Sequence, residues 1–153
     1  MRIRASPLPM KHIPAIKAVM TPFPYSIDAD APANTALATM EEHGISHLPV
    51  MRNGSLVGII SHRAVRSAAG SAISTDSDTN LRVRDIYQSD PYVVDLNERL
   101  DKVLIGMSDR QEDMVLITRN GRLAGVFTNS DACRSYAALL RQMALDTGGD
   151  DAA

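Results

Sequence analysis

The sequence predicts an α+β fold, of the broad α/β class, in which two copies of a strand–helix–strand–strand–helix (βαββα) unit pack about a pseudo-two-fold axis. The main observation is an internal repeat, because adding 67 to a residue number in the first half gives its counterpart in the second half without a gap. The matching pairs include Pro24 with Pro91, Asp28 with Asp95, Leu37 with Leu104, Asn53 with Asn120, and Gly58 with Gly125. An offset that stays constant over this length indicates a tandem duplication.

Hydrophobic periodicity predicts the elements of the first copy. After a helical turn at 15–20, the expected elements are a strand at 24–28, a helix at 33–43, strands at 48–51 and 56–60, and a helix from 61 to 68. Gly44 directly follows the first helix, where a glycine commonly ends a helix. The dipeptide Asn53-Gly54 lies between the two apolar runs, which is typical of a two-residue hairpin turn.

The predicted domain boundaries follow the repeat and the local composition. They are an N-terminal arm (1–13), a first repeat (14–68), a linker rich in Gly, Ser, Thr and Asp (69–80), a second repeat (81–143) and a flexible acidic tail (147–153). Each repeat alone offers a three-stranded sheet that is too small to be stable. We therefore expect the repeats to share one core, with two pseudo-equivalent clefts between them.

Composition and charge argue against several classes of protein. The 153 residues are 44% hydrophobic and 22% charged, as in an ordinary globular protein, and the net charge of −2 provides no basic surface for nucleic acid. No apolar run reaches the roughly 18 residues of a membrane span, and the N-terminus lacks the apolar core of a secretory signal. The single cysteine, Cys133, fits a reducing compartment. These features predict a cytoplasmic protein that does not act at a membrane.

No catalytic or metal-binding arrangement emerges from the sequence. No general base lies beside Ser130 or Cys133, and Cys133 is expected to be a small buried residue on a helix. The four histidines show no metal-ligand spacing. We therefore expect a protein that is not an enzyme, has no metal site and requires no cofactor.

Short motifs in both halves resemble those of one known family. They are Val19–Pro22, Gly44–Val50 and Gly54–Ser61 in the first half, and Asp85–Tyr87 and Gly121–Asp131 in the second. In this order, over about residues 14–143, the chain resembles a tandem CBS (cystathionine β-synthase-type) domain pair, or Bateman module. The resemblance implies βαββα repeats, commonly in a disc-like homodimer. It also implies an adenosyl ligand (AMP, ADP, ATP, S-adenosylmethionine or a relative) that adjusts the activity of a separate effector protein.

The resemblance further implies a composite cleft between the repeats. Its candidate binding residues are Thr128, Asp131, Met20, Tyr25, Ser26 and Ile45. Asp131 would accept hydrogen bonds from ribose hydroxyls, and Thr128 would face a phosphate or another polar substituent together with the amides of the helix start. The backbone of Tyr25 and Ser26 would meet the adenine edge, and Met20 and Ile45 would form apolar walls.

A second, weaker cleft is expected at the pseudo-equivalent position. Its candidate residues are Ser61, His62, Arg63, His47 and Tyr92. Here the counterpart of Asp131 is Ala64, while the counterpart of His47 is Met114, which follows Asp113. The acid for ribose and the basic residues for phosphate are therefore split between the two clefts. A multiply phosphorylated ligand is disfavoured beside Asp131 unless positive charge comes from Arg119, Arg122, Arg134 or a second copy of the chain.

Two alternatives require no ligand. Thr128-x-x-Asp131 also fits a capping box, in which the two side chains bond the backbone at a helix start. The chain could then be a structural dimerisation or interaction module with degenerate clefts. The helix after Asp131 is longer than its counterpart and carries an apolar stripe, formed by Tyr136, Leu139, Leu140 and Met143. We expect this extra length to pack in a homodimer interface.

Overall fold

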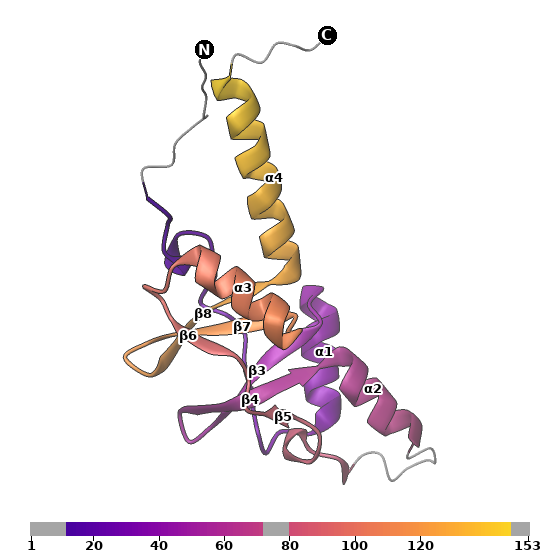
Figure 1. Cartoon of the computed structure of the whole chain (residues 1–153). Coiled ribbons are helices and arrows are strands. Elements are labelled where there is room, and N and C mark those ends of the chain that lie inside the picture. The colour runs from indigo at the N-terminus through magenta and orange to yellow at the C-terminus, as the bar shows by residue number, and fades with distance from the viewer. Residues whose placement is uncertain (1–11, 72–79, 148–153) are drawn as a thin grey trace.

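The computed structural model describes residues 12–71 and 80–147 (Figure 1). Nearly all of the expected arm, most of the expected linker and the tail beyond Thr147 lie outside these residues. The described residues form strands (β), α-helices (α) and short 3₁₀ helices (η). In chain order they are η1 (Ile16–Ala18), β1 (Thr21–Pro22), β2 (Ile27–Asp28), α1 (Ala33–His43), β3 (His47–Arg52), β4 (Ser55–Ser61), α2 (His62–Ser71), η3 (Val83–Asp85), β5 (Gln88–Ser89), β6 (Val93–Asp95), α3 (Leu100–Arg110), β7 (Met114–Arg119), β8 (Arg122–Thr128) and α4 (Asn129–Asp146). Each repeat contains the βαββα order that the sequence predicted.

The two sheets each have four strands, not the three that were expected. Their strand orders are β2-β3-β4-β5 and β1-β8-β7-β6. The fourth strand of each sheet comes from the beginning of the other repeat and pairs antiparallel, β5 with β4 and β1 with β8. These exchanged strands have two residues each, too few to give a periodic pattern in the sequence. The exchange means that neither repeat completes its sheet alone.

Two glycines allow the exchanged strands to approach. A Cβ atom on Gly58 would overlap with the backbone carbonyl of Gln88 and the ring of Tyr87. A Cβ atom on Gly125 would overlap with the side chain of Met20. Because Gly58 and Gly125 are counterparts in the repeat, both sheets accept their fourth strand in the same way.

The turns predicted from the sequence are confirmed. Asn53 and Gly54 have φ angles of 52° and 81°, and Asn120 and Gly121 have 52° and 79°. Positive φ at both central residues is the requirement of a type I′ hairpin turn, which Asn-Gly meets at little cost. Helix α1 ends at His43 and is capped by Gly44, whose φ of 65° is left-handed, as expected for a glycine in this position.

The core is shared between the repeats, as expected. Each repeat has its own buried apolar cluster, and a further cluster lies where the two sheets meet. This joint cluster comprises Ile59, Met114, Leu116 and Val126, with Leu56 and Leu123 packed against it. Ile59 and Val126 are counterparts, so the pseudo-two-fold axis runs through this cluster.

Each 3₁₀ turn docks on the loop before the first helix of the other repeat. In η3, the amide of Val83 donates to the carbonyl of Ala31 (2.9 Å), and that of Arg84 donates to Ala29 (2.8 Å). The counterpart turn η1 forms the matching backbone bonds, with Ile16 donating to Glu98 and Lys17 to Leu96. The backbone docking is therefore pseudo-symmetric.

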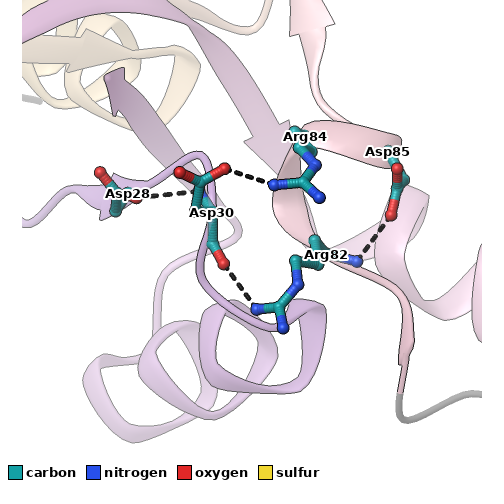
Figure 2. A network of polar contacts seen from close by, with 5 residues as sticks. All are labelled: Asp28, Asp30, Arg82, Arg84 and Asp85. Atoms are coloured by element: carbon teal, nitrogen blue, oxygen red, sulfur yellow. Dashed lines mark hydrogen bonds and ion pairs between the residues drawn. The ribbon is translucent and has the colours of Figure 1, made fainter. Parts of the chain in front are cut away.

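The side chains at these two docking points are not symmetric (Figure 2). Arg84 Nη1 pairs with Asp30 Oδ1 at 2.6 Å, and Arg82 Nη1 donates to the Asp30 carbonyl at 2.8 Å. The counterparts of Asp30 and Arg84 are Asn97 and Lys17, which cannot form an ion pair. The turn that leads into the second repeat is thus held by charges that its counterpart lacks.

Helix α2 is longer than expected, and most of helix α4 projects away from the core (Figure 1). Helix α2 continues to Ser71, so residues 69–71 are helical and not part of a linker. Helix α4 has 18 residues against 10 in α2, and Figure 1 shows it projecting away from the sheets. None of its residues is buried, and Tyr136 is 63% exposed. Cys133 is exposed as well, so the expectation that it is buried was wrong.

Candidate functional site

A cavity of about 560 Å³ lies between the repeats, where β8 ends and α4 begins. We call it the Asp131 cleft. It is lined by residues of both repeats: Thr21, Pro24, Tyr25, Gly44, Ile45, Ser46, His47, Pro49, Asp113, Met114, Val126, Thr128, Asn129, Ser130, Asp131 and Arg134. A composite cleft of this kind was expected at this junction.

The structure brings together four of the six residues predicted for this cleft. Tyr25, Ile45, Thr128 and Asp131 line it, but Met20 and Ser26 do not. Met20 packs against the core of the second repeat and over Gly125, because the exchange of β1 carries it there. Ser26 is exposed just before β2.

The Asp131 carboxylate bonds the start of α4. Its Oδ2 accepts hydrogen bonds from the Thr128 amide (2.9 Å) and hydroxyl (3.1 Å), and the Thr128 hydroxyl accepts from the Asp131 amide (3.3 Å). The capping box considered from the sequence is therefore present. The other oxygen, Oδ1, pairs with Arg134 Nη1 at 3.1 Å. Because the Arg134 side chain is 71% exposed, Oδ1 faces a partner that can move aside for a ligand.

The first repeat keeps half of this cap. The amide of Ala64 donates to Ser61 Oγ at 3.0 Å, but the alanine side chain at position 64 has no carboxylate to accept a bond from Ser61 in return. Helix α2 still forms from the residue after Ser61. A helix can therefore start at this junction without an acid at the position of Asp131.

A second cavity of about 440 Å³ lies at the pseudo-equivalent position. We call it the Ser61 cleft; its lining residues are Ser46, His47, Ile59, Ile60, Ser61, Arg63, Ala64, Ile86, Gln88, Gln111, Glu112, Asp113 and Met114. Of the predicted residues, Ser61, Arg63 and His47 line it, whereas His62 and Tyr92 do not. His62 Nε2 instead lies 3.1 Å from Glu41 Oε2.

The two clefts share a wall formed by Ser46, His47, Asp113 and Met114. These residues are two counterpart pairs, 46 with 113 and 47 with 114, that meet across the pseudo-two-fold axis. The sequence placed His47 in the Ser61 cleft alone, so the expected split between acidic and basic residues is less complete than predicted. Burial lowers the pKa of His47 below its ordinary value, although Asp113 and Glu112 act in the opposite direction.

An aromatic contact that the sequence analysis missed borders the Asp131 cleft. The ring of Tyr25 stacks on His43 at the end of α1, with centroids 3.7 Å apart. The counterpart pair also forms a contact, because the Arg110 guanidinium lies 4.5 Å from the centre of the Tyr92 ring. Tyr25 and His43 are the counterparts of Tyr92 and Arg110 under the 67-residue offset, so the repeat was the sequence feature that could have indicated these contacts. The contact orients Tyr25 at the mouth of the cleft.

The described residues offer neither a metal-binding cluster nor a membrane-spanning helix. Over 12–71 and 80–147, no three His, Cys, Asp or Glu side chains gather in a way that could hold a metal ion. In the same ranges, every helix is too short or too polar to cross a membrane.

Comparison with known proteins identifies both repeats. The family model described as "CBS domain" matches residues 16–71 and 83–138. Inosine-5′-monophosphate dehydrogenase of Thermoplasma acidophilum is 31% identical over 108 residues, which are 70% of this chain. The chain spans about a fifth (20%) of the length of that relative.

Two solved structures are similar in fold. The CBS domain pair of protein MJ0100, in complex with 5′-methylthioadenosine and S-adenosyl-L-methionine, has a TM-score of 0.73 at 22% identity and covers 84% of this chain and 99% of that chain. CBSX2 in complex with AMP has a TM-score of 0.72 at 18% identity and covers 82% of this chain and 98% of that chain. These likenesses confirm the fold predicted from the sequence.

Proposed function

The chain belongs to the CBS domain family, and on this premise we propose that it is a non-catalytic regulatory module that binds an adenosyl ligand in the Asp131 cleft. Ligand binding would change the activity of a separate effector protein. The observation that carries the proposal is the cavity of about 560 Å³ that Tyr25, Ile45, Thr128 and Asp131 line together from both repeats. Two proteins of the same fold bind adenosyl compounds, which supports this class of ligand.

Asp131 is the proposed ribose contact. Its side chain is 17% exposed, and its Oδ1 pairs with Arg134, whose side chain is itself exposed. A ribose hydroxyl donating to this oxygen would form a hydrogen bond to a charged group, which contributes roughly 1.5–3 kcal/mol. Tyr25 and Ile45 would hold the base from the opposite repeat, so a bound ligand would bridge the two repeats. This bridging is the physical basis of the proposed signal.

A ligand screen tests the proposed function. AMP, ATP, 5′-methylthioadenosine and S-adenosylmethionine are added separately, and the midpoint of thermal unfolding is measured. A ligand at 100 times its dissociation constant should stabilise the native state by roughly 2.7 kcal/mol. We expect at least one compound to raise the midpoint. The absence of any shift with all four would contradict the proposal.

Asp131→Ala is expected to abolish most of that shift while the protein still folds. The variant also loses one half of the capping box, so the ligand-free protein should lose about 1 kcal/mol of stability. Asp101→Ala is the matched control, because Asp101 lies in the first turn of α3 and lines neither cleft. The control should keep the full ligand-induced shift.

The exposed face of α4 favours a second function, that of a dimerisation module. Tyr136, Leu140 and Leu145 are 63%, 46% and 75% exposed on a helix that projects from the body of the molecule (Figure 1). We propose that a second copy of the chain covers this face, in a cytoplasmic homodimer. The exposed Cys133 fits the reducing conditions of that compartment.

Light scattering at tens of micromolar is expected to give the mass of a dimer. Leu140→Glu should shift the protein to a monomer, because a charge would have to be buried in the apolar interface. Gln142→Ala is the control, since Gln142 bonds Asp146 along the same helix and does not belong to the apolar stripe. A wild-type protein that is a clean monomer would disprove the proposed dimer.

A further inference from the structure

The described lining of the Asp131 cleft contains two carboxylates, Asp113 and Asp131, but one guanidinium, that of Arg134. The Asp131 and Arg134 side chains face one another at 3.1 Å, so the Arg134 guanidinium balances the Asp131 carboxylate. Among the described residues that line this cleft, Arg134 is the only arginine or lysine. A second carboxylate in the wall of the cleft therefore has no arginine or lysine of the described lining left to neutralise it.

Asp113 provides that further negative charge. Its Oδ1 accepts a hydrogen bond of 2.8 Å from the neutral side-chain amide of Asn129, and its carbonyl accepts from the Asn129 amide at 3.1 Å. Within the described residues, none of the ion pairs involves Asp113. The hydrogen bond from Asn129 therefore fixes the position of the Asp113 carboxylate but leaves its negative charge in place.

His47 is the remaining group in the wall that could carry positive charge. Burial lowers the pKa of His47, and this effect is larger than the opposing effect of Asp113 and Glu112. The imidazole is therefore mostly neutral near neutral pH, because its pKa lies below the ordinary value of 6.5. At that pH the lining of the Asp131 cleft carries one uncompensated negative charge.

The repeat shows that the fold does not require an acid at this position. The counterpart of Asp113 is Ser46, which lines the same two clefts with a neutral hydroxyl. The adjacent strands β3 and β7 nevertheless form in both repeats. The carboxylate at 113 thus changes the electrostatics of the cleft without being needed for the architecture.

We propose that Asp113 makes the Asp131 cleft selective for adenosyl ligands whose 5′ substituent is uncharged or cationic. This inference rests on the proposed function. A 5′ phosphate carries a charge of about −1.5 to −2 near neutral pH. The Asp113 carboxylate, which is exposed and lines the cleft, repels it by Coulomb interaction at short range. A thioether or sulfonium substituent meets no such repulsion.

Isothermal titration with two matched ligands tests the selectivity. 5′-Methylthioadenosine and AMP share adenosine and differ at the 5′ position, so their affinity ratio isolates the substituent. Near neutral pH and at physiological ionic strength, wild-type protein should bind 5′-methylthioadenosine at least about tenfold more tightly than AMP, a difference of about 1.4 kcal/mol. Asp113→Asn keeps an oxygen for Asn129 and should shrink this ratio about tenfold.

Glu112→Gln is the matched control for Asp113→Asn. Glu112 is adjacent in sequence and also acts on His47, but it lines only the Ser61 cleft. Its removal should leave the affinity ratio unchanged. Selectivity that falls equally in both variants would mean that general charge, not Asp113, sets the preference, and would overturn the inference.

The pH dependence of AMP binding provides a second test. Asp113 and Glu112, just before β7, act electrostatically on His47. The other charged groups that line a cleft together with His47 are Asp131 and Arg134 on α4 and Arg63 on α2. As the pH falls toward the His47 pKa, the imidazole gains a proton and AMP affinity should rise; as the pH rises through that pKa, the gain is lost. His47→Gln should lack the part of this dependence that does not come from AMP itself. An identical pH profile in wild type and His47→Gln would contradict the assigned protonation state.

The outcomes separate this inference from the proposed function. If AMP binds as tightly as 5′-methylthioadenosine, the cleft is an adenosyl site without the selectivity, and only the inference fails. If Asp113→Asn leaves the ratio unchanged, the same conclusion follows. If no adenosyl compound binds, both the proposed function and the inference fail.

Discussion

Gly58→Ala is expected to lower the free energy of unfolding by about 3 kcal/mol, the upper end of the usual cost of overpacking. The added methyl group would overlap with the backbone carbonyl of Gln88 and the ring of Tyr87. A backbone atom cannot rotate away as the end of a flexible side chain can. The variant must therefore push β5 from the edge of β4 or distort the strand. Urea unfolding, followed by circular dichroism, measures the change.

Gly70→Ala is the control for this substitution. A Cβ atom on Gly70 meets no atom within 4 Å, and the residue lies in helix α2. Alanine is favoured over glycine in a helix by up to about 1 kcal/mol, so the control should be neutral or more stable than wild type. Equal stability of the two variants would contradict the conclusion that β5 lies too close to Gly58 to leave room for a methyl group.

Phe127→Ala is expected to cost about 3–5 kcal/mol, the usual range for truncating a buried aromatic side chain. Phe127 is fully buried (0% exposed) in the core of the second repeat. It directly precedes Thr128, so the cavity left behind would also loosen the end of β8 that positions the Asp131 cleft. We expect a lower midpoint of urea unfolding together with weaker ligand binding.

Phe23→Ala removes the same atoms at an exposed position and is the matched control. The Phe23 side chain is 93% exposed, and its truncation should change stability by no more than about 0.5 kcal/mol. Equal losses in the two variants would show that the effect at position 127 comes from the aromatic residue as such and not from its burial.

Local signals and the repeat predicted most of the fold. The Asn-Gly turns and Gly44 could be identified because positive φ angles restrict which residues fit, and this restriction is visible in the sequence. The 67-residue offset predicted the two related clefts, since repeats with the same pattern of apolar and turn residues fold into similar units. The general location of the Asp131 cleft followed from these features and from the family resemblance.

The sequence could not predict the contacts made between the repeats. Met20 was placed in the cleft, but the exchange of β1 moves it into the core of the second repeat. His47 was assigned to one cleft, although it lies beside the axis and lines both. Each of these features depends on pairing between distant segments, which periodicity within one repeat does not contain. The position of Cys133 was also predicted wrongly, because no residue of α4 is buried and Cys133 lies on an exposed part of that helix.

The exchange of edge strands has a consequence for the order of folding. Residues 58 and 89 pair within the first part of the chain, whereas Thr21 pairs with Val126 near the other end. Closing a longer loop costs more chain entropy, and contacts between distant residues slow folding. During synthesis from the N-terminus, the sheet of the first repeat can be completed well before β8 is made. Strand β1, although it is made before β8, is therefore among the last elements to reach its native position.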